Sequence, residues 1–107
     1  MEEFTVSATA SETAARVAVS GDVDLAAADR LLAAVAPLIR PGAEVAVDCA
    51  DVRFLDSAGL RALLELNRKA QDAGGTLALV APSEAVSRLL ELAGVAGLFT
   101  VRPPEGS

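Results

Sequence analysis

Several residue types that carry chemistry in other proteins are missing from this chain of 107 residues. Histidine is absent, which removes the usual general base and the commonest metal ligand, and excludes a Ser-His-Asp hydrolase. Tryptophan and tyrosine are absent too, so an aromatic platform for stacking nucleic-acid bases is not expected. We therefore expect no enzymatic activity, no metal site and no cofactor.

Cysteine is represented by Cys49 alone, so neither an intramolecular disulfide nor a cysteine-rich zinc site can form. We interpret Cys49 as a small, partly buried hydrophobic residue. Long apolar runs are also missing, because the longest extends from Leu31 to Ile39 and is too short to span a bilayer. The acidic start, Met1-Glu2-Glu3, lacks the basic and apolar regions of a signal peptide. These features predict a soluble, cytoplasmic domain.

Basic residues are outnumbered, with 9 Lys and Arg against 15 Asp and Glu, for a net charge of −6. Binding to nucleic acid requires clustered Lys and Arg, so a nucleic acid is not an expected partner. A membrane is not expected either, because no apolar run is long enough to span one. An acidic surface is ordinarily a means of staying in solution.

The length predicts a single domain over residues 1–107, large enough for its own hydrophobic core. No repeat, low-complexity segment or linker divides the chain. We expect the folded core to span about residues 4–101 and the last residues, 102–107, to form a flexible tail.

Alternating or continuous apolar residues predict five strands, the first two joined by a tight link that makes them antiparallel neighbours. The predicted ranges are 4–10, 15–20, 44–48, 76–81 and 98–101.

Three helices separate the later strands. Asp24 is placed to cap the first, whose apolar stripe is expected at Leu25, Ala28, Leu32, Val35 and Ile39, with Pro37 kinking or shortening it. The second helix starts at the Asp56-Ser57 segment and the third is capped by Ser83. The resulting order, β-β-α-β-α-β-α-β, predicts an α/β fold with a mixed, mostly parallel sheet covered by helices.

Acidic residues follow two strands that should be neighbours. Loops after parallel strands gather at the carboxyl edge of the sheet, so the residues expected there together are Asp22, Asp24, Asp48, Asp51, Asp56 and Ser57. Ser57 falls in the first turn of the second helix, where backbone N–H groups are unpaired and a phosphate is well accommodated. The alternative is that Asp56 or Ser57 only caps this helix.

Two motifs in this arrangement resemble the STAS domain of bacterial anti-sigma factor antagonists, over about Phe4 to Val101. They are Gly21-Asp22-Val23-Asp24 and Phe54-Leu55-Asp56-Ser57-Ala58-Gly59-Leu60. The resemblance implies a small cytoplasmic protein that binds an anti-sigma factor, frees the sigma factor for transcription, and is inactivated when the anti-sigma factor, acting as a kinase, phosphorylates its serine.

Carried over to this chain, the resemblance makes Ser57 the phosphorylated residue. Many members of the family have a second serine where this chain has Ala58, and Leu-Ser where it has Cys49-Ala50. The implied partner-binding residues are Asp22, Asp24, Asp56, Ser57, Ala58, Gly59 and Arg61. The implied partners are an anti-sigma factor serine kinase and a serine phosphatase, and the chain is expected to be a monomer or a weak dimer.

Two other functions fit parts of the pattern. A response-regulator receiver phosphorylates an aspartate after its third strand, as Asp48 would be, but here two strands precede the first helix and no lysine follows the last strand. Similar domains also serve as constitutive, unphosphorylated subunits of lipid ABC transporters or as cytoplasmic tails of anion transporters, and the subunit function remains an alternative.

Overall fold

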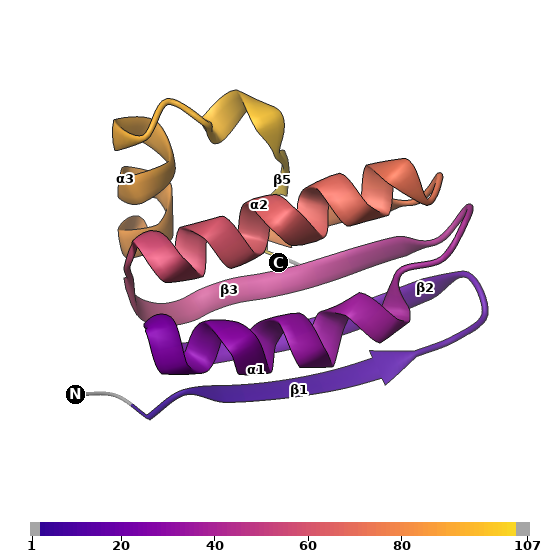
Figure 1. The fold of residues 1–107 in the computed structure, drawn as a ribbon, viewed down its shortest axis with the longest axis horizontal. Helices are drawn as coiled ribbons and strands as arrows, with labels where there is room; N and C mark the ends of the chain where they lie inside the picture. The colour runs from indigo at the N-terminus through magenta and orange to yellow at the C-terminus, as the bar shows by residue number, and fades with distance from the viewer. Residues whose placement is uncertain (1–2, 105–107) are drawn as a thin grey trace.

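Five strands and three α-helices make up residues 3–104, the part of the chain that the computed structural model describes (Figure 1). The strands are β1 (Thr5–Ala10), β2 (Ala14–Val23), β3 (Glu44–Leu55), β4 (Thr76–Val80) and β5 (Thr100–Arg102). The helices are α1 (Leu25–Val35), α2 (Ser57–Asp72) and α3 (Glu84–Leu92), and short 3₁₀ turns follow at Ala36–Leu38 and Ala96–Leu98.

The sheet has the order β1-β2-β3-β4-β5, with β1 antiparallel to β2 and the other neighbours parallel. This confirms the predicted α/β class and element order. Parallel neighbours need crossover helices, and right-handed crossovers between successive strands put those helices on one face of the sheet. In Figure 1, α1 and α2 lie side by side in front of the strands.

The core lies between this face of the sheet and the helices. Fully buried valines and leucines of the strands meet Leu31 and Val35 of α1 and Leu66 of α2. The stripe predicted for α1 was partly wrong, because Leu25 is 72% exposed and Leu31 is 1% exposed. The buried side of α1 consists of Ala27, Ala28, Leu31 and Val35, and Leu25 lies off this stripe, in solvent.

Strands β2 and β3 continue well beyond the predicted ranges of 15–20 and 44–48. Their parallel pairing contains two register shifts, between Ala18 and Ser20 and between Gly21 and Asp22. The extra residues lie on β3, whose burial loses its alternation after Cys49, whereas burial along β2 alternates throughout and only Gly21 and Asp22 interrupt its apolar pattern. Gly21 has a φ of +85°, which suits glycine, and a Cβ there would collide with the backbone of Glu3.

The ends of other elements also differ from prediction. Pro37 shortens α1, as expected, since the α-helix ends at Val35. The last strand begins at Thr100, after the 3₁₀ turn, and pairs with β4 through Arg102, whose guanidinium also contacts the Glu44 carboxylate on β3. Arg102 was therefore wrongly assigned to a tail, while residues 105–107 lie outside the described part of the chain.

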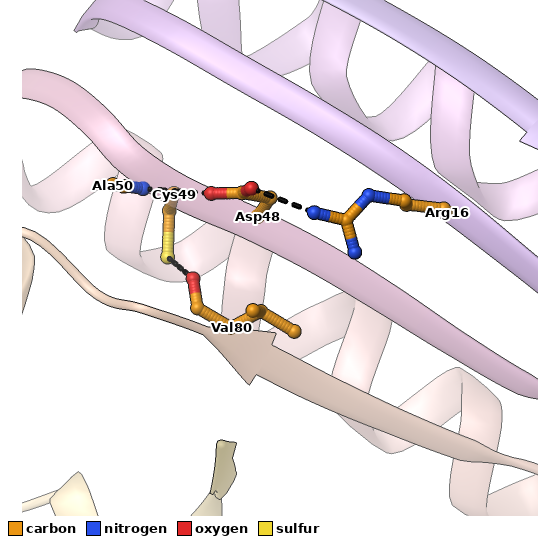
Figure 2. A network of polar contacts seen from close by, with 5 residues as sticks. All are labelled: Arg16, Asp48, Cys49, Ala50 and Val80. Atoms are coloured by element: carbon orange, nitrogen blue, oxygen red, sulfur yellow. Dashed lines mark hydrogen bonds and ion pairs between the residues drawn. The ribbon is translucent and has the colours of Figure 1, made fainter. Parts of the chain in front are cut away.

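Figure 2 shows two neighbouring residues of β3, with Asp48 directed toward Arg16 on β2 and Cys49 toward Val80 on β4. The Asp48 carboxylate accepts a hydrogen bond from the Arg16 guanidinium at 2.9 Å, away from the core. Cys49 is 2% exposed, and its Sγ lies 3.8 Å from the Val80 carbonyl oxygen. Burial, together with the Asp48 charge, raises the pKa of the Cys49 thiol to about 12. Cys49 therefore packs as a small apolar residue, as predicted, but is fully and not partly buried.

Substituting Gly59 in the first turn of α2 should destabilise the fold. A Cβ there would lie 2.5 Å from Leu55 Cδ1 and 2.6 Å from the Val23 carbonyl oxygen. In an unconstrained helix Gly59→Ala would gain roughly 0.5–1 kcal/mol, whereas crowding of this kind costs typically about 1–3 kcal/mol. We expect urea titration to show a net loss for Gly59→Ala and little change for Gly97→Ala, whose Cβ meets nothing within 4 Å. A more stable Gly59→Ala protein would contradict this packing.

The buried Cys49 thiol should make stability fall at alkaline pH. An unfolded thiol ionises near pH 8.5, whereas the native pKa is about 12, so the unfolded state loses its proton first as pH rises. The stabilisation is complete below about pH 8.5 and is lost progressively toward pH 12. The urea midpoint should therefore fall further between pH 7 and pH 10 for the wild type than for Cys49→Ala. Equal decreases in the two proteins would show that the native fold does not raise the pKa of the Cys49 thiol.

Candidate functional site

The carboxyl ends of β2 and β3 bring two helix starts together. Val23 and Leu55, the last residues of the two strands, are paired in register, and the backbone N–H of Asp56 donates to the Val23 carbonyl oxygen at 3.3 Å. Asp24 and Asp56 follow these strands directly and begin α1 and α2. The starts of α1 and α2 consequently lie at the same end of the sheet, at the left of Figure 1.

Asp24 and Asp56 cap their helices in the same way. Asp24 Oδ1 accepts a hydrogen bond from the Ala27 N–H at 3.0 Å, and Asp56 Oδ1 accepts one from the Gly59 N–H, also at 3.0 Å. Both aspartates have an extended backbone, with φ near −100° in each case. The cap of α2 is therefore Asp56 and not Ser57, which leaves the serine hydroxyl out of the capping interaction.

Ser57 is the first residue of the 16-residue helix α2 and its side chain is exposed. The first backbone N–H groups of a helix have no partner within it, and the helix dipole is positive at this end. A negative group attached to Ser57 would thus meet a favourable field from α2 and an unfavourable one from the Asp56 carboxylate. The side chain can be modified without unpacking any core residue.

The remaining predicted site residues are not all exposed like Ser57. Gly59 is buried beneath it, against Val23 and Leu55, whereas Ala58 is half-buried and Arg61 is exposed one turn along α2. Asp22 is half-buried and lies within β2, paired with Phe54, and not in a loop as predicted.

Asp48 and Asp51 do not belong to this site, contrary to the prediction. Both lie inside β3, because that strand runs on to Leu55. Asp48 precedes Asp56 by eight residues, or roughly 25 Å of extended strand, and its carboxylate is paired with Arg16 (Figure 2). A receiver needs its aspartate at the end of the strand, so the position of Asp48 argues against that alternative.

An apolar groove beside the site was not predicted. It has a volume of about 540 Å³ and lies between the end of β3 and α3, with Phe54 49% exposed and Leu92 77% exposed. The other lining residues are Arg53, Leu55, Glu84, Ala85, Arg88 and Leu89. One signal was available, since Leu92 falls off the helical stripe formed by Val86, Leu89 and Leu90.

Within residues 3–104, no three carboxylate, cysteine or histidine side chains lie close enough to hold a metal ion. No helix in that range is both long and apolar enough to cross a membrane.

Comparison with known proteins agrees with this architecture. The family model described as "Mlab, STAS domain" matches residues 6–101. The anti-sigma-B factor antagonist of Bacillus subtilis (strain 168) is 28% identical over 86 residues, which cover 80% of this chain and 79% of the relative.

Solved structures give the same result. An anti-sigma factor antagonist from Mycobacterium paratuberculosis superposes with a TM-score of 0.82 at 27% identity, covering 96% of this chain and 88% of the other. SpoIIAA of Bacillus in the phosphorylated form shares the fold, with a TM-score of 0.69 at 19% identity, covering 92% and 90%. With its sheet order, its paired helix starts and a family match over nearly the whole chain, this protein belongs to the STAS domain family.

Proposed function

We propose that this protein is an anti-sigma factor antagonist that acts in the cytoplasm and is switched off by phosphorylation of Ser57. The observation that carries the proposal is the position of Ser57: exposed, first in α2, and relieved of capping by Asp56. The relatives named as anti-sigma factor antagonists support the same role. The partner is an anti-sigma factor with serine kinase activity, and a serine phosphatase would restore the active form.

In this proposal the unphosphorylated surface around Ser57 is the binding surface, and the chain itself performs no catalysis. Its contributing residues are Asp22, Asp24, Asp56, Ser57, Ala58, Gly59 and Arg61. Most of them are polar or small, so they supply specificity more than buried apolar area. The neighbouring groove, with exposed Phe54 and Leu92, offers the apolar contact that interfaces concentrate at their centre.

Phosphorylation would change the interface and leave the fold intact. A phosphate adds about −1.5 to −2 charges at neutral pH. The start of α2 favours that charge by about 0.3–1 kcal/mol, which partly offsets repulsion from Asp56. A partner packed over Ser57 would have to desolvate the dianion. Two like charges about 4 Å apart cost roughly 4 kcal/mol at an effective dielectric constant near 20, so a loss of a few kcal/mol of affinity is reasonable.

A constitutive STAS subunit of a lipid ABC transporter is the second candidate. The matching family model carries the name Mlab, which is the observation that favours it. In that role Ser57 would contact a transporter ATPase and would never receive a phosphate. The two functions thus differ in what a charge at Ser57 does and in whether ATP and a kinase modify it.

Charge at Ser57 should control binding. We expect Ser57→Asp to bind the anti-sigma factor kinase about 100-fold more weakly or worse, for a loss of a few kcal/mol. Ser57→Ala should bind constitutively and accept no phosphate. Both should melt within a few degrees of the wild type, because Ser57 is exposed.

The measurement is calorimetric titration of these proteins against each anti-sigma kinase of the same genome. Ser11→Asp is the matched control, because Ser11 is also exposed but lies where β1 turns into β2, at the other end of the sheet. Tight binding by Ser57→Asp, with no phosphate transferred from ATP to Ser57, would favour the transporter subunit.

Asp24 should matter for binding more than for folding. Removing a capping carboxylate costs typically about 1 kcal/mol, which a domain of ordinary stability tolerates. Asp24→Ala should therefore fold, yet bind the kinase or receive phosphate poorly. Ser83→Ala is the control, because Ser83 caps α3 through Val86 N–H at 3.2 Å and is neither one of the proposed binding residues nor a lining residue of the groove. If both substitutions lower the melting temperature equally and neither affects binding, Asp24 is only a cap.

A further inference from the structure

The edge strand β1 carries none of the features that usually protect an edge. It is first in the sheet order, and in Figure 1 no described element lies beyond it. Its sequence, Thr5 to Ala10, contains no charged residue and no proline, and it pairs with β2 without a bulge. Proteins normally guard such edges with charges, prolines or bulges, because an unguarded edge pairs with another strand.

The backbone groups that face outward can be assigned from the hairpin. The Ser11 N–H donates to the Ala14 carbonyl oxygen at 2.8 Å. In an antiparallel ladder, hydrogen-bonded and non-hydrogen-bonded pairs alternate. Counting back along β1, the N–H and C=O groups of Val6, Ala8 and Ala10 therefore point away from β2.

We propose that two copies of this chain associate through β1, antiparallel, about a two-fold axis at Ala8. In this register Ala8 pairs with Ala8 of the partner subunit, and Val6 pairs with Ala10 of the partner subunit. Every outward N–H and C=O group of the strand then has a partner. The interface is self-complementary, as a two-fold interface must be.

The side chains are compatible with that register. Val6 is half-buried and would gain cover, while Ser7 would lie opposite Thr9 of the partner subunit, a favourable cross-strand hydroxyl pair. Because Thr5–Ala10 contains no charged residue, the pairing brings no like charges together within the strand. On a chain with a net charge of −6, this uncharged strand is a surface on which a second copy meets little repulsion.

The dimer should be weak and strengthened by salt. One short strand pair buries less than the roughly 1,000 Å² of a stable interface. The exposed Glu3 and Glu12 flank the strand, so carboxylates of both copies approach at each end. The paired sheets run in opposite directions, which leaves the two Ser57 sites at opposite ends and uncovered. The inference is therefore independent of the proposed function.

Disulfide trapping of single-cysteine variants tests the register. Across a hydrogen-bonded pair the Cα atoms lie about 5.5 Å apart, within the range of a disulfide. Ala8→Cys should therefore form a covalent dimer under mild oxidation. Thr5→Cys is the control on the same strand, because the two Thr5 residues would lie roughly 20 Å apart in the dimer. Native Cys49 is buried with a raised pKa and does not compete.

We expect Ala8→Cys to cross-link roughly tenfold faster than Thr5→Cys, or more, because association raises its effective concentration. Equal rates would overturn the proposal, and a faster Ser7→Cys would overturn the register. Sedimentation velocity tests it without cysteines: wild type and the exposed control Ala50→Lys should self-associate as concentration and salt rise, and Ala8→Lys should not. A monomeric wild type, or an Ala8→Lys protein that associates equally, would also refute it.

Discussion

The site depends on the parallel pairing of β2 and β3, which ends at Val23 and Leu55. That shared end fixes where both helices start, so Asp24 and Asp56 become adjacent caps. It also sets how closely α2 approaches β2: a Cβ at position 59 would lie 2.6 Å from the Val23 carbonyl oxygen. Glycine at that position is what allows the first turn of α2, and with it Ser57, to lie directly over the strand ends.

The division of roles between neighbouring residues follows from this geometry. Asp56 satisfies the backbone of α2, Gly59 packs, and Ser57 is left exposed with no structural task of its own. A residue free of structural duties can be modified without unfolding the protein. In the sheet order β2 separates the edge strand β1 from β3, so the proposed self-association would leave Ser57 accessible to the proposed partner.

The sequence was sufficient for the element order, the mixed sheet and the placement of Asp24, Asp56 and Ser57 at one edge. It failed where periodicity was interrupted: two extra residues in β3 hid the full length of that strand, and so Asp48 and Asp51 were assigned to the wrong place. In β2, Gly21 and Asp22 were taken as the end of a strand that continues to Val23. The groove at Phe54 and Leu92 depends on how α3 packs against β3, and the position of Leu92 off the apolar stripe of α3 was its only sign in the sequence. The burial of Leu31 and the exposure of Leu25 were likewise decided by tertiary packing.

Whether Ser57 carries a phosphate in the cell is the question on which the proposed switch depends. The most direct measurement is the intact mass of the protein recovered from its own cells across growth phases, with and without phosphatase treatment, followed by fragmentation to locate the modified residue. The switch requires a fraction that is heavier by one phosphate, sensitive to phosphatase and modified at Ser57. An unmodified protein under every condition, or a phosphate confined to another residue, would contradict it.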